Sequence, residues 1–462
     1  MSRIASGSPT PTTSASQVRI RLTAGSVDIQ LPGDVGPILV STALRRIQLS
    51  QLVNKLLDTE RPIPFEFLIN GQFLRTSIDD FLSSRGISAE TTLDVKYVRA
   101  LIPPLHTTTF EHDDWVSSVD ILSAASAEEK AIASGSYDGH LRIWSTSGNA
   151  LATSPGAGEG GHANSIQATR WVSPTQLATS SSDRTLKIWK YDDTTLTPAL
   201  ELYGHTSSVD SIAVHEPSGR ILSASADGML ALWTTSKSDA PAAPAQLLPT
   251  AASNKRRKLS NSSRQVPQRG SLSMLSGHAQ QASAVIFAPN DPTVAYSTSW
   301  DHSMKTWDLT TSACVDTRTT AQSLLTLCAL PARNVLATGT SARHITLIDP
   351  RASATSFVAM TLRGHTNAVV ALAASPEDDY SLVSGSHDGT CRIWDLRNTR
   401  ASVASDGGGP VCESVYSFGR DGVQGSRVGG EGVKVFGVCW DADVGIVSCG
   451  EDKRVQINRS TP

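Results

Sequence analysis

The sequence has few aromatic residues (5%), few charged residues (18%) and no apolar run that would span a membrane. A membrane-crossing helix needs roughly 18 or more consecutive apolar residues. Residues 1–16 are rich in Ser, Thr and Pro and lack the apolar stretch of a signal peptide. We therefore expect a soluble intracellular protein without membrane contact. The formal net charge is only −3, so no extended basic surface is available to a polyanion, and any nucleic-acid contact has to be local.

Cysteine pairs and catalytic motifs are also absent. All six cysteines lie in the last third of the chain, and none forms a C-x-x-C pair. This argues against a zinc site or a disulfide framework and favours buried thiols in a reducing compartment. No phosphate-binding loop, G-x-S-x-G elbow or H-E-x-x-H motif occurs. The sequence thus predicts a protein without enzymatic activity, resident metal, cofactor or small-molecule substrate.

Internal repetition is the strongest positive signal. An Asp followed six residues later by a Trp recurs after small-residue stretches, with the Trp at positions 144, 189, 233, 307 and 394. The interval of 74 residues from Trp233 to Trp307 fits one repeat plus an insertion. The interval of 87 residues from Trp307 to Trp394 fits two repeats, with the degenerate copy ATGTSARHITLID (337–349) between the two Trp positions. A last copy, SCGEDKRVQIN, keeps Asp452 but has Asn458 in place of Trp. Seven copies with a period of about 40–45 residues predict a seven-bladed, all-β WD-repeat propeller.

Four copies share a His, an Asp and a Trp at a common spacing. These are His162, Asp183 and Trp189; His205, Asp227 and Trp233; His278, Asp301 and Trp307; and His365, Asp388 and Trp394. A buried Trp N–H needs an acceptor, and an Asp fixes the tautomer of a His. We therefore predict one hydrogen-bonded chain in each blade, completed by a strand hydroxyl such as Ser223 or Ser225. A Ser/His/Asp set also suggests a hydrolase, but a catalytic triad occurs once, and these sets recur. Their predicted role is structural.

The two ends of the ring are expected to meet. In each repeat the outer strand follows the Trp position, yet the last copy ends at Asn458, four residues before the terminus. Residues 105–110, just before His112, are Thr-rich and extended in character. We predict that they supply the missing outer strand and seal an open sheet edge.

A smaller domain is expected over residues 17–98, between a disordered tail at 1–16 and the propeller at 99–462. QVRIRL (17–22) and VDIQL (27–31) alternate like a hairpin, and apolar residues at helical spacing follow, with Ser50 as the expected helix cap. FEFLI (65–69), a turn at Asn70-Gly71, a short helical turn near 78–82 and a strand at 92–98 complete the pattern. The order is that of an α+β ubiquitin-like domain. A generic α+β cap is the alternative.

Two insertions interrupt the repeats. Residues 235–273 are rich in Ala, Pro and Ser and then basic, so we expect them to form no packed strands. They contain Lys255, Arg256, Arg257 and Lys258, four adjacent cations of the kind that nuclear-import receptors bind, although a merely solvated basic loop has the same composition. Residues 398–432 are Gly-rich and are expected to be a flexible surface loop.

The N-terminal module, the stretch LDVKYVRALIPPL, the box DDWVSSVD (113–120) and the seven repeats together resemble a known family. It is the eukaryotic WD-repeat ribosome-assembly factor of the PeBoW complex, the Ytm family in fungi. The stretch PFEFLINGQFLRTSIDDFL looks like part of the notchless-like (NLE) domain of that family. Notchless itself shares this module but normally carries eight repeats, so seven favour the PeBoW member.

The resemblance implies a non-enzymatic role in maturing the large ribosomal subunit and its rRNA, in the nucleus, nucleolus and nucleoplasm. It implies that the propeller binds the block-of-proliferation WD-repeat protein, which also holds Pescadillo, within the pre-60S particle. The module would dock on the AAA ATPase midasin, where a Glu of the family completes the coordination of a divalent ion such as Mg²⁺. The matching residue in GISAETTLDVKY is Glu90. A WD-repeat substrate receptor of a ubiquitin ligase is the alternative function, although no ligase-docking element is visible.

Overall fold

The computed structural model describes residues 16–33, 35–59, 61–122, 130–248, 266–353, 358–400, 409–420 and 433–460. The chain forms two compact units, Met1–Ile102 with Arg397–Arg400, and Pro103–Leu396 with Ala401–Pro462. Apart from Ser16, the expected disordered tail lies outside the described residues. Within those ranges, no helix is both long and apolar enough to cross a membrane.

The N-terminal unit is an α+β fold in which one sheet packs against a helix. Its elements in chain order are β1 (Gln17–Ala24), η1 (Val27–Ile29), β2 (Ile38–Ser41), α1 (Arg46–Leu57), β3 (Phe65–Ile69), β4 (Gln72–Phe73), α2 (Ile78–Arg85) and β5 (Leu93–Arg99). The sheet has the order β2-β1-β5-β3-β4, with β1 and β5 parallel. Alternate strand residues such as Ile20 and Phe67 face Val53 of α1 in one buried cluster. The predicted α+β class is thus confirmed.

Two details of this unit differ from the sequence prediction. Val27–Ile29 is a 3-10 turn rather than a hairpin strand, and β2 pairs with β1 instead, Val40 opposite Val18. The turn is held because Tyr97 Oη donates a hydrogen bond of 2.7 Å to the carbonyl of buried Ile29. Ser50 does not cap α1. The helix begins one turn earlier, where the Gln48 side chain accepts from the Arg45 amide at 2.7 Å.

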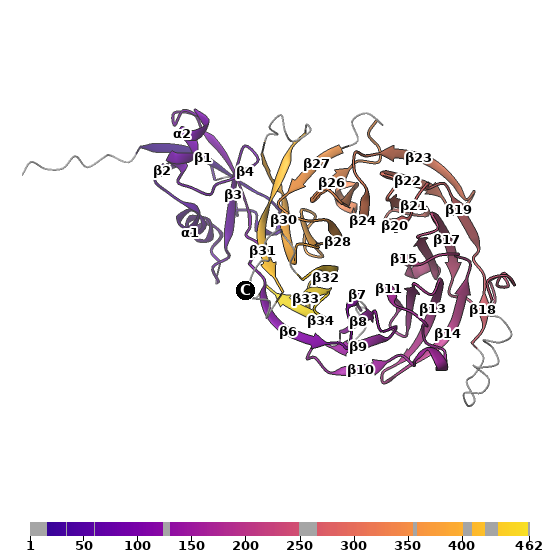
Figure 1. Ribbon diagram of the computed structural model, residues 1–462. Coiled ribbons are helices and arrows are strands. Elements are labelled where there is room, and N and C mark those ends of the chain that lie inside the picture. Colours follow the sequence, from indigo (N-terminus) through magenta and orange to yellow (C-terminus); the bar gives the residue numbers. More distant parts are fainter. Residues whose placement is uncertain are drawn as a thin grey trace, which may run out of the picture. The chain divides into compact units, whose positions relative to one another are not determined.

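The C-terminal unit is a ring of seven blades whose sheets follow one another around a central axis (Figure 1). The strands of blades 1 to 4 are as follows. Blade 1 has β7 (Val116–Ile121), β8 (Ala131–Ser136), β9 (Leu141–Ser145) and β10 (Ala150–Thr153); blade 2 has β11 (Ile166–Ser173), β12 (Gln176–Ser181), β13 (Thr185–Asp192) and β14 (Thr195–Tyr203); blade 3 has β15 (Val209–His215), β16 (Arg220–Ser225), β17 (Met229–Thr234) and β19 (Ser273–Ser276); blade 4 has β20 (Ala282–Ala288), β21 (Asp291–Ser299), β22 (Ser303–Asp308) and β23 (Ala313–Thr319).

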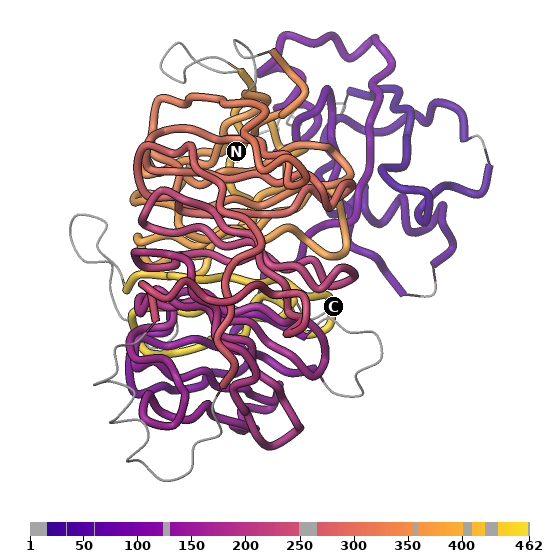
Figure 2. Tube along the Cα trace, turned by 90° about the vertical axis from the view of Figure 1, so that its right-hand side faces the viewer, coloured from indigo at the N-terminus to yellow at the C-terminus, as the bar shows by residue number. Residues whose placement is uncertain are grey.

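The remaining blades complete the ring and confirm the predicted seven-bladed propeller. Blade 5 has β24 (Leu324–Leu330), β25 (Val335–Thr340), β26 (His344–Ile348) and β27 (Val358–Arg363); blade 6 has β28 (Val369–Ala374), β29 (Ser381–Ser386), β30 (Thr390–Arg400) and β31 (Val411–Gly419); blade 7 has β32 (Val435–Asp441), β33 (Gly445–Gly450), β34 (Arg454–Arg459) and β6 (Leu105–Glu111). Figure 2 shows the blades from the side. Apolar side chains fill the space between neighbours, as where Trp189 of blade 2 joins Leu141 and Ile143 of blade 1.

The predicted closure of the ring is confirmed. β6 pairs antiparallel with β34, Phe110 opposite Val455 and Thr108 opposite Ile457 (Figure 1). Phe110, which is 2% exposed, stacks on Trp144 of blade 1 with a ring separation of 5.3 Å. The segment before the first repeat therefore joins both ends of the ring.

Both insertions contain more ordered structure than their composition predicts. In the first, β18 (Gln268–Arg269) adds to blade 2, and β19, the outer strand of blade 3, begins at the last residue of the insertion, Ser273. In the second, β30 runs on to Arg400 and β31 is the outer strand of blade 6, so residues 398–432 are not one surface loop. Composition missed these strands because strand pairing here is decided by distant partners. The four-cation motif 255–258 lies outside the described residues.

Candidate functional site: blade polar sets and an exposed carboxylate

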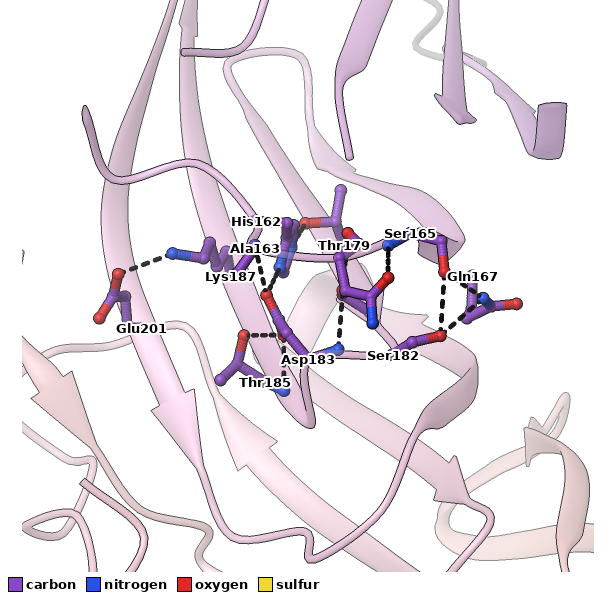
Figure 3. Close-up of polar contacts among 12 residues, drawn as sticks. His162, Ala163, Ser165, Gln167, Thr179, Ser182, Asp183, Thr185, Lys187 and Glu201 are labelled. Carbon is purple, nitrogen blue, oxygen red and sulfur yellow. Dashed lines mark hydrogen bonds and ion pairs between the residues drawn. The ribbon is translucent and has the colours of Figure 1, made fainter. Parts of the chain in front are cut away.

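The predicted hydrogen-bonded chain is present in blade 2 (Figure 3). His162 Nδ1 lies 2.9 Å from Asp183 Oδ2, and Nε2 lies 2.8 Å from Thr179 Oγ1, which also accepts from Trp189 Nε1 at 2.7 Å. The network assigns the tautomer: Nδ1–H donates to the carboxylate, and the hydroxyl donates to Nε2. Asp183 further accepts from the Ala163 amide and from Thr185.

Blades 3, 4 and 6 repeat this arrangement. The hydroxyls are Ser223, Ser297 and Ser384, each 2.7 Å from a His Nε2 and each accepting from the blade Trp at 2.7–2.8 Å. Of the two serines expected in blade 3, Ser223 is therefore the member, while Ser225 bonds to the Ser208 carbonyl. The Gly before each His is needed for packing, since a Cβ on Gly204 would lie 2.8 Å from the Trp233 ring.

Three of these sets hold a neutral imidazole beside an ionised carboxylate. Burial lowers the pKa of His162, His278 and His365, and this outweighs the opposing effect of each Asp partner. Burial alone would raise the pKa of Asp227, but hydrogen bonds from His205 and backbone amides lower it to about 2. The hydroxyl-bearing residues are fully buried and already bonded on both sides. No substrate carbonyl can reach them, so the arrangement stabilises the blades instead of providing a nucleophile.

The first blade is a variant of the pattern. His112 Nε2 contacts Ser134 Oγ at 3.2 Å, but Nδ1 accepts from Arg142, which in turn pairs with Asp138 at 2.8 Å. Burial and the Arg142 charge lower the pKa of His112 to about 3. Blade 5 lacks the set altogether, and the Thr338 and Thr340 hydroxyls donate to backbone carbonyls of their own sheet.

In blade 7 an arginine takes the place of the histidine. Arg420 Nε and Nη2 each lie 2.8 Å from one Asp452 carboxylate oxygen, and Nη1 lies 2.6 Å from Ser448 Oγ. Nη2 also donates to the Arg454 carbonyl at 2.6 Å, and the side chain is 1% exposed. Sequence analysis missed this residue because it follows β31 without a repeat signature. The available signal was the Gly419-Arg420 pair, which stands where other repeats have Gly-His.

A second missed feature is a buried ion pair in blade 2. Lys187 Nζ lies 2.6 Å from Glu201 Oε1 and donates to the Gly160 carbonyl at 2.8 Å (Figure 3). Tyr203 and Gln268 donate to the other oxygen of Glu201. Gln268 comes from the first insertion, so this network holds one end of that insertion against the blade.

The cysteines and Glu90 were also assigned from the sequence. All six cysteines are free thiols, with Cys314 alone exposed, so no disulfide is present. Within the described ranges, no group of three or more His, Cys, Asp or Glu residues could hold a metal.

Glu90 is exposed in the loop between α2 and β5. Its amide donates to Ser88 Oγ at 3.3 Å, and Thr91 Oγ1 donates to the Ser88 carbonyl at 2.8 Å, so the loop backbone is held.

Comparison with known proteins agrees with this architecture. The model of the NLE (NUC135) domain matches residues 18–82. The model of the WD domain, G-beta repeat, matches 104–145, 159–190, 196–234, 269–308 and 357–395, which are blades 1, 2, 3, 4 and 6. The unmatched blades 5 and 7 are those without the His/Asp/Trp set.

Similar full-length proteins cover nearly the whole chain. The chain is 61% identical over 96% of its length to "Ribosome biogenesis protein ytm1" of Aspergillus terreus, covering 96% of that protein. It is 60% identical to the protein of the same name in Aspergillus fumigatus, with 97% of each chain covered, and 60% identical to that of Emericella nidulans, with 96% and 95% covered. With both domains matched and identity this high along the chain, this protein belongs to the ytm1 family of ribosome biogenesis proteins.

Proposed function

We propose that this protein acts in ribosome biogenesis as a non-enzymatic scaffold for maturation of the large subunit and its rRNA. The family name supports ribosome biogenesis. The scaffold role is supported by the blade polar sets, which are buried and saturated, and by the division of the chain into two units that can bind separate partners. Such work places the protein on pre-60S particles in the nucleus, nucleolus and nucleoplasm.

Each unit has its own partner in this proposal. The propeller binds the block-of-proliferation WD-repeat protein, and through it Pescadillo. The N-terminal unit docks on midasin, which then pulls the protein from the particle. The proposal rests on the resemblance to the PeBoW family and, within the structure, on one observation, the exposed carboxylate of Glu90.

The chemistry of Glu90 fits a ligand offered to a partner's metal. Mg²⁺ prefers carboxylate oxygen in a nearly octahedral shell. Glu90 stands three residues before β5, in a loop tied by Ser88, so the side chain projects from a fixed backbone. The described part of this chain has no group of three or more His, Cys, Asp or Glu that could hold a metal. In this proposal the ion and its other ligands come from midasin.

A titration of the midasin adhesion domain with the full-length protein tests this proposal. We compare wild type, Glu90→Asp and Glu90→Gln, each with Mg²⁺ and with chelator. Glu90→Gln keeps the shape but removes the charge, and Glu90→Asp shortens the reach by about 1.5 Å, a single C–C bond. Both should bind weakly, and chelation should abolish wild-type binding.

The matched control is Asp58→Asn in the same unit. Asp58 is also an exposed carboxylate, and its left-handed conformation (φ 52°) tolerates Asn. This variant should bind midasin like wild type, and all variants should still bind the propeller partner. In cells, Glu90→Gln should be dominant, because it enters the particle but is not removed. Equal midasin affinities for wild type and Glu90→Gln would refute the metal-ligand role.

A further inference from the structure

Two outer blade edges in this protein carry an added parallel strand. In blade 2, β18 pairs parallel with β14, Gln268 beside Glu201. In blade 5, the start of β31 pairs parallel with β27, Val411 beside Thr361. Both added strands begin after a proline, and neither comes from the hairpin that builds the blade it joins.

The same backbone amide anchors the added strand in both blades. The Glu201 amide donates to the Pro267 carbonyl at 2.9 Å, and the Thr361 amide donates to the Pro410 carbonyl at 3.1 Å. Glu201 lies opposite Lys187, two residues before the Trp189 position; Thr361 lies opposite Thr346, two residues before Ile348, which replaces the Trp. The two anchoring amides are therefore equivalent positions of the blade.

Proline suits the position just before such a strand. It has no N–H to leave unpaired at the edge, and it favours an extended residue before it.

The equivalent backbone amide in blade 4 donates to a side chain instead of to an added strand. Thr317, opposite Lys305, donates to its neighbour Asp316 at 2.9 Å, and Arg318 pairs with the same carboxylate. A charged side chain thus blocks that edge, as natural edge strands often are blocked.

In the part of the chain that the structure describes, no strand pairs with the outer edge of blade 7, and no carboxylate accepts from the equivalent amide there. β6 is seven residues long and is the last strand of its sheet. Its one charged residue is the terminal Glu111, which pairs with Arg454 of β34 at 2.8 Å, so residues 105–110 carry no Asp, Glu, Lys or Arg. Thr109 lies opposite Gln456, two residues before Asn458, which makes its amide the equivalent of those of Glu201 and Thr361. The amide of His112 donates inward to Lys453 at 2.8 Å. By alternation along an antiparallel strand, the amide of Thr109 faces outward.

The outer strand of blade 6, β31, already pairs at its start with β27 of blade 5, and blades 1 and 3 have much shorter outer strands. The outer strands of blades 1 and 3, β10 and β19, are four residues each. β6 therefore offers the longer template for backbone pairing, and Leu105 at its start is 62% exposed. Strand addition draws its affinity from such main-chain hydrogen bonds and needs only shallow side-chain contacts.

We propose that the outer edge of β6 binds an extended, proline-initiated segment of a partner protein as a parallel strand. The partner's proline carbonyl accepts from the Thr109 amide, and small or β-branched residues follow it along the threonines of β6. A second copy of this chain is the less suitable occupant. Two β6 strands related by a two-fold axis would pair antiparallel, whereas both strands added within this protein are parallel. This inference is independent of Glu90 and midasin.

The chain's own added strand supplies the probe. We use a fluorescent peptide of residues 409–415 carrying Cys412→Ser, and measure its binding to the full-length protein by anisotropy and by hydrogen–deuterium exchange. We expect binding that slows exchange within residues 105–111. Thr109→Pro removes the outward amide at an edge position where proline is tolerated, and should weaken binding about tenfold.

Two further variants keep the test decisive. Thr107→Lys with Thr109→Lys leaves the backbone intact but charges the edge, and should weaken binding similarly. Thr153→Pro changes the equivalent position of blade 1, opposite Arg142, and should leave binding unchanged. Unaltered exchange over 105–111, or equal peptide affinity for wild type and both Thr109 variants, would overturn the proposal. So would a concentration-dependent dimer that Thr109→Pro abolishes, since the edge would then belong to a second copy.

Discussion

Replacing Arg420 is expected to destabilise the propeller more than most single substitutions. The guanidinium makes four hydrogen bonds, two of them to Asp452, whose side chain is itself only 10% exposed. Arg420→Met keeps much of the volume but leaves the Asp452 carboxylate, the Ser448 hydroxyl and the Arg454 carbonyl without this donor. Removing one partner of a buried pair costs roughly 3–5 kcal/mol, which is the loss we expect.

A double variant separates the contribution of the Arg420–Asp452 ion pair from the contribution of side-chain packing. Arg420→Met leaves the negative charge of Asp452 without its partner, and Asp452→Asn removes that charge. The two changes together should therefore cost about 1–3 kcal/mol less than the sum of the single changes. Arg420→Lys should fall between wild type and Arg420→Met, because an ammonium retains the charge but cannot form the two-pronged contact.

Tryptophan fluorescence during urea unfolding measures these losses selectively. All nine Trp residues lie after residue 102, so the signal reports only the propeller. Asp443→Asn provides a control, because Asp443 is an exposed carboxylate of the same blade, with a side chain 76% exposed; it should cost less than about 1 kcal/mol. If Arg420→Met costs no more than Asp443→Asn, or if the single changes add without coupling, Arg420 does not replace the blade histidine as described.

Three further predictions concern closure, acidity and import. Deleting residues 1–110 removes β6 and should lower the melting temperature of the propeller, whereas deleting 1–98 should not; equal melting of the two forms would contradict closure by β6. Folded His112, with its pKa lowered to about 3, stays neutral while the unfolded chain binds a proton below about pH 6.5, so stability should fall as pH drops from 7 to 5, by about 2 kcal/mol from this residue. His112→Asn should lose that part of the slope, and an unchanged slope would argue against the burial of a neutral imidazole. Changing Lys255, Arg256, Arg257 and Lys258 to Ala should reduce nuclear accumulation relative to Lys237→Ala, and equal accumulation would mean that the motif is only a solvated loop.

The sequence predicted the propeller and its polar sets because both depend on local spacing. Within one blade, Asp227 and Trp233 flank a tight turn and its following strand, so a separation of six residues brings them to the same cluster in each of the four regular copies. The closing strand was also predictable, since the last copy visibly lacks one. Helix and strand boundaries were less so: the start of α1 depends on Gln48 reaching back to Arg45, and propensity alone does not show that contact.

The sequence by itself determined the fold class, the number of blades and the four regular His/Asp/Trp sets, since they follow from a short-range pattern that is complete in five copies and still recognisable in two degenerate ones. Only the tertiary structure decided which distant segments pair. Arg420 meets Asp452 across 32 residues, Gln268 reaches Glu201 across 67, and β31 joins both blade 5 and blade 6. Edge pairing and ion pairing depend on which backbone amides and charges remain unsatisfied once the blades have formed, and no local pattern carries that information.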